Sequence, residues 1–187
     1  TDNGILMKLF SKKTFIAAVV FIAAEVSAFS LGAGAQFNLT PSFLINQDGA
    51  KNPKIDFSAI GTFKFDRLSA AIGAGLNAGF HNSSFTFGSS VFFDYWAINF
   101  QIENTLNFYS GVGASATLVT DIKNWKFETG VRFFAGLNRL LIDNYIEIYV
   151  QQNIVPSYSM ILGNNADFDS QSFRFNFPLE IGTRLHF

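Results

Sequence analysis

The sequence predicts an all-β protein, an eight-stranded antiparallel up-and-down transmembrane β-barrel. The first observation is the composition: 49% of the 187 residues are hydrophobic and only 14% are charged, against a usual charged share of about 25%. The second is that, beyond the N-terminus, no apolar run of about 18 residues could form a membrane-spanning helix. The third is the repeated alternation of apolar and polar residues. A closed barrel is the remaining way for such a chain to cross a bilayer.

Residues 1–28 are expected to form a signal peptide ahead of the barrel. Translation is expected to start at Met7, which is followed by basic residues, an apolar stretch and then small residues. The apolar stretch is about ten residues long, too short for a membrane anchor. We expect cleavage between Ala28 and Phe29, which leaves residues 29–187 as the barrel domain.

The first three strands are expected at residues 29–43, 55–65 and 68–80. Successive side chains of a strand point to opposite faces, and in each segment one parity is apolar while the other is polar or glycine. Turn-forming residues at 46–54 separate the first pair of strands, and Asp66–Arg67 forms a tight turn before the third.

The fourth strand is expected at residues 85–102, where the apolar parity changes. Up to Phe93 the apolar residues have odd numbers, and from Trp96 they have even numbers. One extra residue in a β-bulge near Asp94–Tyr95 would reverse the faces in this way. A turn at Asp94 is the alternative, but it would give nine strands. The bulge is favoured because bacterial single-chain barrels have even strand counts.

The last four strands are expected at residues 106–118, 125–138, 145–155 and 173–187, with a polar loop at 157–172 before the final strand. Across all eight strands the outward parity contains no charged residue, whereas most of the 15 glycines lie on the inward parity. The inside of a narrow barrel has room mainly for small residues. A soluble β-sandwich would also have an uncharged face, its core, but its water-facing strands gain nothing from glycine.

Aromatic residues are expected in girdles at the two membrane interfaces, since they lie near strand ends. These residues are Trp96, Trp125, Tyr145 and Tyr158.

The chain ends in a polar-x-Gly-x-x-hydrophobic-x-aromatic pattern formed by Glu180, Gly182, Leu185 and Phe187. This pattern resembles the C-terminal signal by which the barrel-assembly machinery recognises bacterial outer-membrane proteins. With its alternating strands, the chain resembles the small eight-stranded outer-membrane barrels, such as the OmpW family and the OmpA transmembrane domain. The resemblance implies export through the periplasm, a place in the bacterial outer membrane, and contact with its lipids. No functional residue of these families can be carried over.

Ten charged residues are expected inside the barrel, five basic and five acidic. They are Asp56, Lys64, Glu103, Lys126, Glu128, Arg132, Glu147, Arg174, Glu180 and Arg184. Buried charges are costly unless they are paired, and equal numbers allow every one to pair. We expect Arg132, Glu180, Glu147 and Arg184 to share one network near the periplasmic side.

A lumen closed by ion pairs indicates a structural or surface-exposed protein that resembles OmpA-type barrels. The alternative is an OmpW-like narrow channel for small, including hydrophobic, molecules, although the charged inward residues depart from that family's apolar lumen. The sequence does not indicate which ligand, if any, binds the loops.

A lipid A-modifying enzyme is a remote third class. His81, beside Ser83 and Ser84, is the one candidate, but its inward parity differs from the outward catalytic groups of such enzymes, and a polar loop histidine is the simpler interpretation. We therefore expect no catalytic residue. The chain has no cysteine and no metal-ligand spacing, so neither a metal nor a cofactor is expected. The net charge of −1 does not favour nucleic acid as a partner.

Overall fold

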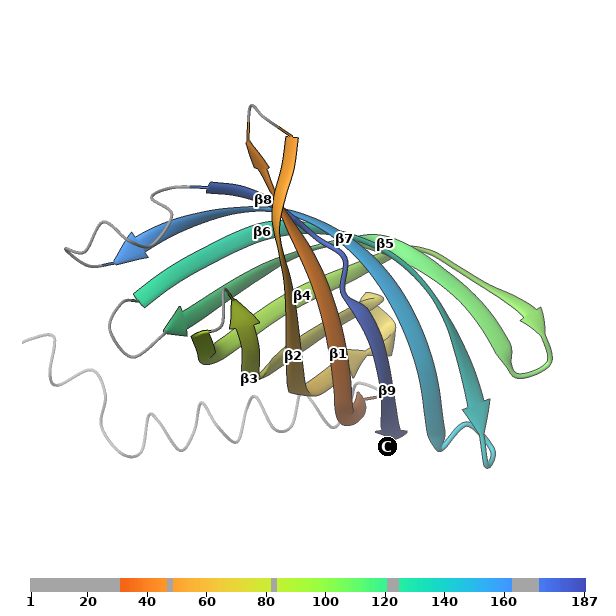
Figure 1. Cartoon of the computed structure of the whole chain (residues 1–187). Coiled ribbons are helices and arrows are strands. Elements are labelled where there is room, and N and C mark those ends of the chain that lie inside the picture. Colours follow the sequence, from red (N-terminus) through yellow and green to blue (C-terminus); the bar gives the residue numbers. More distant parts are fainter. Residues whose placement is uncertain (1–30, 47–48, 82–83, 121–124, 163–171) are drawn as a thin grey trace, which may run out of the picture.

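The computed structural model describes residues 31–46, 49–81, 84–120, 125–162 and 172–187, and nearly all of them lie in strands (Figure 1). The expected signal peptide, including the Ala28–Phe29 cleavage site, lies outside the described residues. A short 3-10 turn, η2, spans Asp66–Leu68. The strands are β1 (Leu31–Asn46), β2 (Gly49–Phe65), β3 (Ala70–His81), β4 (Ser84–Glu103), β5 (Leu106–Thr120), β6 (Trp125–Leu141), β7 (Ile146–Leu162), β8 (Ser172–Asn176) and β9 (Leu179–His186).

The strands form one closed antiparallel barrel. Each strand from β1 to β7 pairs with the next along the chain. Both β8 and β9 lie between β7 and β1, so these two short strands share one position and close the sheet. The barrel therefore has eight strand positions, which confirms the predicted up-and-down architecture and excludes a two-sheet sandwich.

The final strand is interrupted at Phe177–Pro178 because proline has no backbone N–H to donate to the ladder. The register is the same on both sides of the break: Val155 faces Asn176 and Gln152 faces Leu179. The Gln152 amide donates to the carbonyl oxygens of Phe177 at 3.3 Å and of Pro178 at 3.2 Å. The Gln152 side chain thus adds to the backbone bond that the Pro178 carbonyl oxygen accepts from the N–H of Asn153 at 2.9 Å.

The phase change in the fourth strand is a bulge, as favoured, because β4 is continuous from Ser84 to Glu103. Its register with β5 shifts between Trp96 and Ile98, and again between Gln101 and Glu103. The first shift comes after Trp96 rather than at Asp94–Tyr95. Trp96 therefore keeps the inward parity of Asp94 and is only 6% exposed. Its assignment to the outward face and to the girdle was wrong.

The seventh strand extends through residues that were expected to be a loop. Ser157 and Ser159 are buried while Tyr158 and Met160 are exposed, so the alternation continues to Leu162. Polar inward residues make the end of a barrel strand resemble a loop in the sequence.

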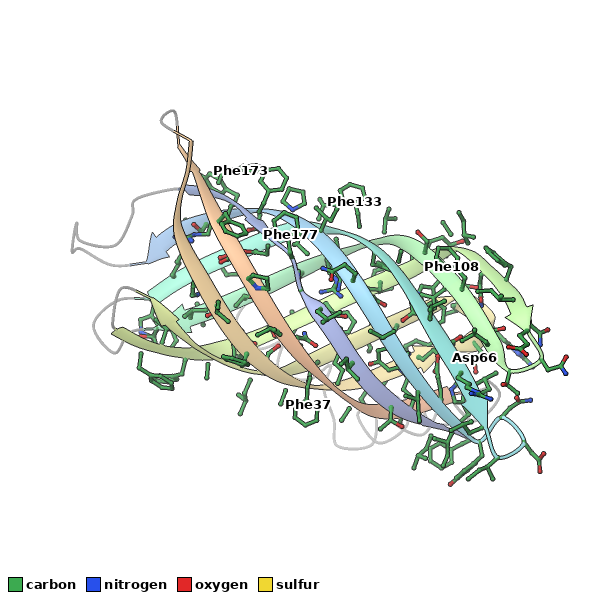
Figure 2. All side chains as sticks on the ribbon, turned by 45° about the vertical axis from the view of Figure 1, so that its right-hand side comes forward. Phe37, Asp66, Phe108, Phe133, Phe173 and Phe177 are labelled. Atoms are coloured by element: carbon green, nitrogen blue, oxygen red, sulfur yellow. The ribbon has the colours of Figure 1, made fainter. Side chains whose placement is uncertain are left out.

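The outer face of the barrel is apolar and rich in aromatic residues. Phe37 and Phe133 point away from the barrel on opposite sides (Figure 2) and are 70% and 49% exposed. Trp125, Tyr145 and Tyr158 also remain exposed, as expected for girdle residues. None of the helices in the described residues is long and apolar enough to cross a membrane.

The two ends of the barrel differ. One end, called the turn end here, carries the chain terminus at Phe187 and the tight turns at residues 66–69, 104–105 and 142–145 (Figure 1). The opposite end, called the loop end, connects the other strand pairs. In outer-membrane barrels the short turns face the periplasm and the longer loops face outward.

Candidate functional site: the charged lumen

The inward parity fills the barrel with polar and charged side chains. Two glycines make room for large rings among them. A Cβ on Gly136 would collide with the ring of Tyr109, and one on Gly182 would collide with the ring of Tyr149. Both tyrosines are 2% exposed. The lumen is thus packed rather than hollow at the level of these rings.

A first group of side chains, called the central cluster, surrounds Arg132. Arg132 Nε donates to Asp94 Oδ1 at 2.7 Å, and Nη2 donates to Glu180 Oε1 at 3.0 Å. The amide of Gln151 donates to Asp94 Oδ2 and to Glu180 Oε2, both at 3.2 Å. Asn153 accepts from Arg132 at 3.2 Å. These residues come from β4, β6, β7 and β9, so the bonds cross the lumen.

A second group, called the turn-end cluster, surrounds the fully buried Glu147. This carboxylate accepts from Lys64 Nζ at 3.1 Å and from Arg184 Nη1 at 3.4 Å. His186 Nε2 lies 2.9 Å from Glu147, and its Nδ1 lies 3.1 Å from Asp66. When both carboxyl groups are ionised they only accept hydrogen bonds, so this arrangement accommodates an imidazolium whose two ring nitrogens both donate. Asn138 Nδ2 also donates to Glu147.

Aromatic side chains fill the lumen beside the turn-end cluster. Trp96, Tyr109 and Phe134 pack with one another inside the barrel. The Lys64 ammonium lies 4.5 Å from the centre of the Trp96 ring. The Arg184 guanidinium lies 3.9 Å from the centre of the Tyr149 ring, whose hydroxyl donates to Gln36 at 2.8 Å. These contacts add cation–π attraction to the ion pairs.

The structure brings the four residues of the expected network together in pairs. Arg132 lies 3.0 Å from Glu180, and Arg184 lies 3.4 Å from Glu147. The two pairs belong to different clusters, because Glu180 and Arg184 are four positions apart on β9, a rise of about 13 Å. The expectation of one shared network is thus replaced by two clusters at different depths.

Asp94 is the partner that the sequence did not identify, since it lies at the phase change. Its carboxylate forms the shortest ion pair of the central cluster. The parity of Phe93, which is outward, would have placed Asp94 inside. Glu103 was wrongly expected in the lumen: it follows the second register shift of β4 and is exposed.

The remaining expected charges lie toward the loop end. Asp56 pairs with Lys54 at 2.7 Å. Glu128 accepts from Ser157 at 2.7 Å and from Asn176 at 2.6 Å. Arg174 and Lys126, which were also expected inside, lie on the inward face. Arg174 is buried and Lys126 is half-buried.

The C-terminal motif divides between the two faces of β9. Glu180 and Gly182 face the lumen, whereas Leu185 and Phe187 are exposed on the outside. The backbone N–H of Phe187 donates to the carbonyl oxygen of Leu31 at 3.0 Å, and its ring contacts Tyr145 edge-on at 6.0 Å. The last residue is therefore part of the barrel seam.

The structure gives little information on the catalytic candidate His81 or on a metal site. The side chain of His81 and the whole of Ser83 lie outside what the structure describes. Within the described ranges, no group of three or more histidine, aspartate or glutamate side chains is arranged to hold a metal ion.

Comparisons with known proteins agree with this architecture. The solid-state NMR structure of the outer membrane protein AlkL in DMPC lipid bilayers is similar, with a TM-score of 0.55 and 13% identity, over 85% of this chain and 90% of that one. The crystal structure of Neisserial surface protein A (NspA) is similar with a TM-score of 0.50 and 9% identity, over 84% of this chain and 97% of that one. No protein-family model matches the chain, and no curated protein matches it in sequence. The fold is therefore that of the small outer-membrane β-barrels.

Proposed function

We propose that this chain is an integral protein of the bacterial outer membrane whose lumen is closed by ion pairs, and that it acts as a structural or surface-exposed barrel rather than as an open pore or an enzyme. The apolar outer wall supports contact with outer-membrane lipids, because the exposed charges Arg139 and Glu103 lie next to the 104–105 turn, at the turn end of their strands. The C-terminal motif supports insertion by the barrel-assembly machinery after export through the periplasm.

The observation that favours closure is that three of the buried ion pairs join strands that are not neighbours in the sheet. Arg132 on β6 reaches Asp94 on β4 and Glu180 on β9. Lys64 on β2 reaches Glu147 on β7. Side chains that bond across a narrow barrel occupy its cross-section. A solute would have to break two such layers in succession to pass.

A channel for hydrophobic molecules is a weaker proposal for the same reason. An apolar solute cannot replace the hydrogen bonds of the charged groups that it displaces, so each displaced pair is left desolvated and unsatisfied. Between the loop end and the central cluster, hydroxyl, amide and charged groups line the lumen beside apolar ones, so an apolar solute would also desolvate polar groups there.

The test is electrical recording from the purified protein in planar lipid bilayers. We expect insertion without a steady single-channel conductance. The variant Arg132→Ala/Glu180→Ala/Lys64→Ala, which removes side chains from both clusters, is expected to show conductance. Thr129→Val, an exposed position on the outer face, serves as the control. A steady, ohmic conductance of the unaltered protein would contradict the closed lumen.

A further inference from the structure

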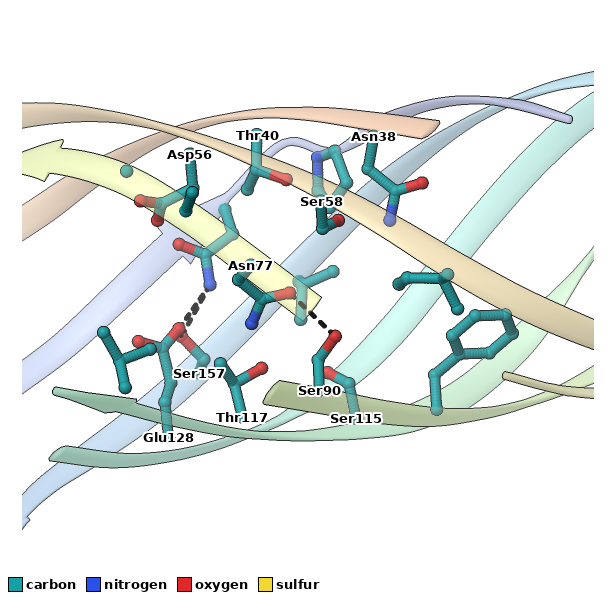
Figure 3. A pocket seen from close by; sticks show the side chains of 18 of the residues that line it. Asn38, Thr40, Asp56, Ser58, Asn77, Ser90, Ser115, Thr117, Glu128 and Ser157 are labelled. Carbon is teal, nitrogen blue, oxygen red and sulfur yellow. Dashed lines mark hydrogen bonds between the residues drawn. The ribbon is translucent and has the colours of Figure 1, made fainter. Parts of the chain in front are cut away.

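A cavity of about 100 Å³ lies inside the barrel, on the loop side of the central cluster (Figure 3). Arg132, Phe92 and Ile60 line its inner part, and Lys54 and Asp56 line its part toward the loop end. The side chains of Lys54 and Asp56 are 15% and 25% exposed, so solvent reaches this part. A cavity needs about 10–15 Å³ to hold one water molecule. This one therefore has room for several waters or for one small solute.

Hydroxyl and amide groups surround the cavity from several strands. Thr40 from β1, Ser58 from β2, and Ser115 and Thr117 from β5 contribute hydroxyl groups (Figure 3). Within the described part of the chain, none of these four hydroxyl groups forms a hydrogen bond. Asn77 from β3 accepts from Ser90 at 3.0 Å, and its amide N–H groups remain available. These groups are half-buried, so they can pair with water or with the hydroxyl groups of a polar solute.

The four charged residues around the cavity, two basic and two acidic, are all engaged in ion pairs or hydrogen bonds. Lys54 and Asp56 pair at 2.7 Å. Arg132 is held in the central cluster. Glu128 accepts from Ser157 at 2.7 Å. A charged solute would find no counter-charge that is not already engaged, so the lining favours an uncharged occupant.

An apolar surface completes the lining. Phe92 is 6% exposed and Ile60 is 4% exposed, and the Arg132 guanidinium lies 4.5 Å from the centre of the Phe92 ring. Water alone gains nothing from such a surface. Sugars and sugar alcohols have both features, since hydroxyl groups that donate and accept alternate with C–H groups that pack on apolar surfaces.

We propose that this cavity binds an uncharged polyhydroxylated molecule of about monosaccharide size, either free or as the terminal residue of a glycan. Hydroxyl groups from β1, β2 and β5 and the amide of Asn77 would meet its hydroxyl groups, with Phe92 and Ile60 against its C–H groups. An apolar solute is excluded, because it would leave the polar lining without partners.

The experiment is an NMR titration of the protein in nanodiscs of zwitterionic lipid, prepared without sugar-based detergent. The signals to follow are the side-chain amides of Asn77 and Asn38, which both line the cavity. The probes are glucose, galactose, mannitol and maltotriose. We expect saturable shifts for at least one probe, with dissociation constants in the millimolar range.

Two matched variants test the site. Thr117→Val removes one cavity hydroxyl with little change of shape and is expected to weaken binding about fivefold, the usual effect of one hydrogen bond. Thr183→Val makes the same change on the outer face of β9, at a residue that does not line the cavity, and should leave binding unchanged. If Thr117→Val does not fold, Ser115→Ala replaces it.

Each outcome has a definite meaning. Saturable binding of the monosaccharides or mannitol alone supports the proposal and identifies a free solute. Binding of maltotriose as well supports it and identifies the end of a glycan. Absence of saturable shifts with all four probes, or equal weakening by Thr183→Val, overturns the proposal and leaves a cavity that holds only water.

Discussion

Replacing Arg132 is predicted to lower the free energy of unfolding far more than replacing either of its carboxylate partners alone. The central cluster contains one cation and two carboxylates, Asp94 and Glu180, whose side chains are 4% and 1% exposed. Arg132→Met leaves both carboxylates buried without their cation. Removing one partner of a buried ion pair costs about 3–5 kcal/mol. We therefore expect Arg132→Met to lower the free energy of unfolding by at least that much.

Glu180→Gln should cost much less, because it removes the carboxylate that is in excess. Arg132 keeps its two hydrogen bonds to Asp94, at 2.7 and 3.0 Å. The glutamine oxygen can still accept from Arg132, so the loss is that of one charge-assisted bond, about 1–2 kcal/mol. In the double variant Arg132→Met/Glu180→Gln only Asp94 is stranded. The two changes should then be coupled by about 1–3 kcal/mol, the range for residues in one network.

The assay is urea unfolding in lipid vesicles, with the two single variants and the double variant measured under the same conditions. His186→Gln is the control, because His186 lies in the turn-end cluster. Paired with Arg132→Met it should be additive within about 0.5 kcal/mol. Additivity of Arg132→Met with Glu180→Gln, or a Glu180→Gln variant as unstable as Arg132→Met, would show that the charge balance of this cluster does not govern its stability.

Three further predictions concern the whole barrel. The protein should fold only in detergent or lipid and migrate differently on gels before and after boiling, because its outer face is apolar; a soluble folded monomer in plain buffer would be inconsistent with the membrane assignment. Deletion of Phe187 should lower outer-membrane levels in cells more than it lowers urea stability of the refolded barrel, since it removes few contacts of the finished seam; equal losses in both measurements would argue against an assembly signal. Ile142→Asn should raise the free energy of unfolding by about 0.5–1 kcal/mol, because Ile142 has a left-handed φ of 50° that asparagine tolerates. An unchanged urea midpoint would mean that this turn stores no strain.

The barrel wall was predictable from the sequence because it depends on one local rule. Alternation with a period of two identifies each strand and its outward face without knowledge of any partner. Errors arose where that rule is interrupted. The bulge after Trp96 lies two residues beyond the Asp94–Tyr95 position that was expected, so one tryptophan was placed on the wrong face. The break at Pro178 has a clear signal in the sequence, since proline is disfavoured inside a paired strand.

The partners inside the lumen were less predictable, because they depend on the stagger between strands. Parity shows that Arg132 and Glu180 both point inward, but not at which depth each one lies. In the structure Gly113 of β5 faces both Asp94 of β4 and Arg132 of β6 in register. That glycine lies between the two charged residues and lets their side chains meet across β5. Asp94 could have been identified as a partner only once both registers were known.

Register also explains how large aromatic rings fit inside the barrel, since parity places Tyr149 and Tyr109 inward but does not show what makes room for them. A narrow lumen suggests small inward residues, yet Tyr149 is almost fully buried there. It fits because it faces Gly182 on the neighbouring strand in direct register, where any Cβ would collide with its ring. A large inward side chain on one strand is therefore accommodated by a glycine on the neighbouring strand, rather than by small residues on its own strand. Gly182 belongs at the same time to the C-terminal motif and to the packing of Tyr149 and Arg184. The glycine of that motif is thus required by the finished lumen, independently of any part that it plays in assembly.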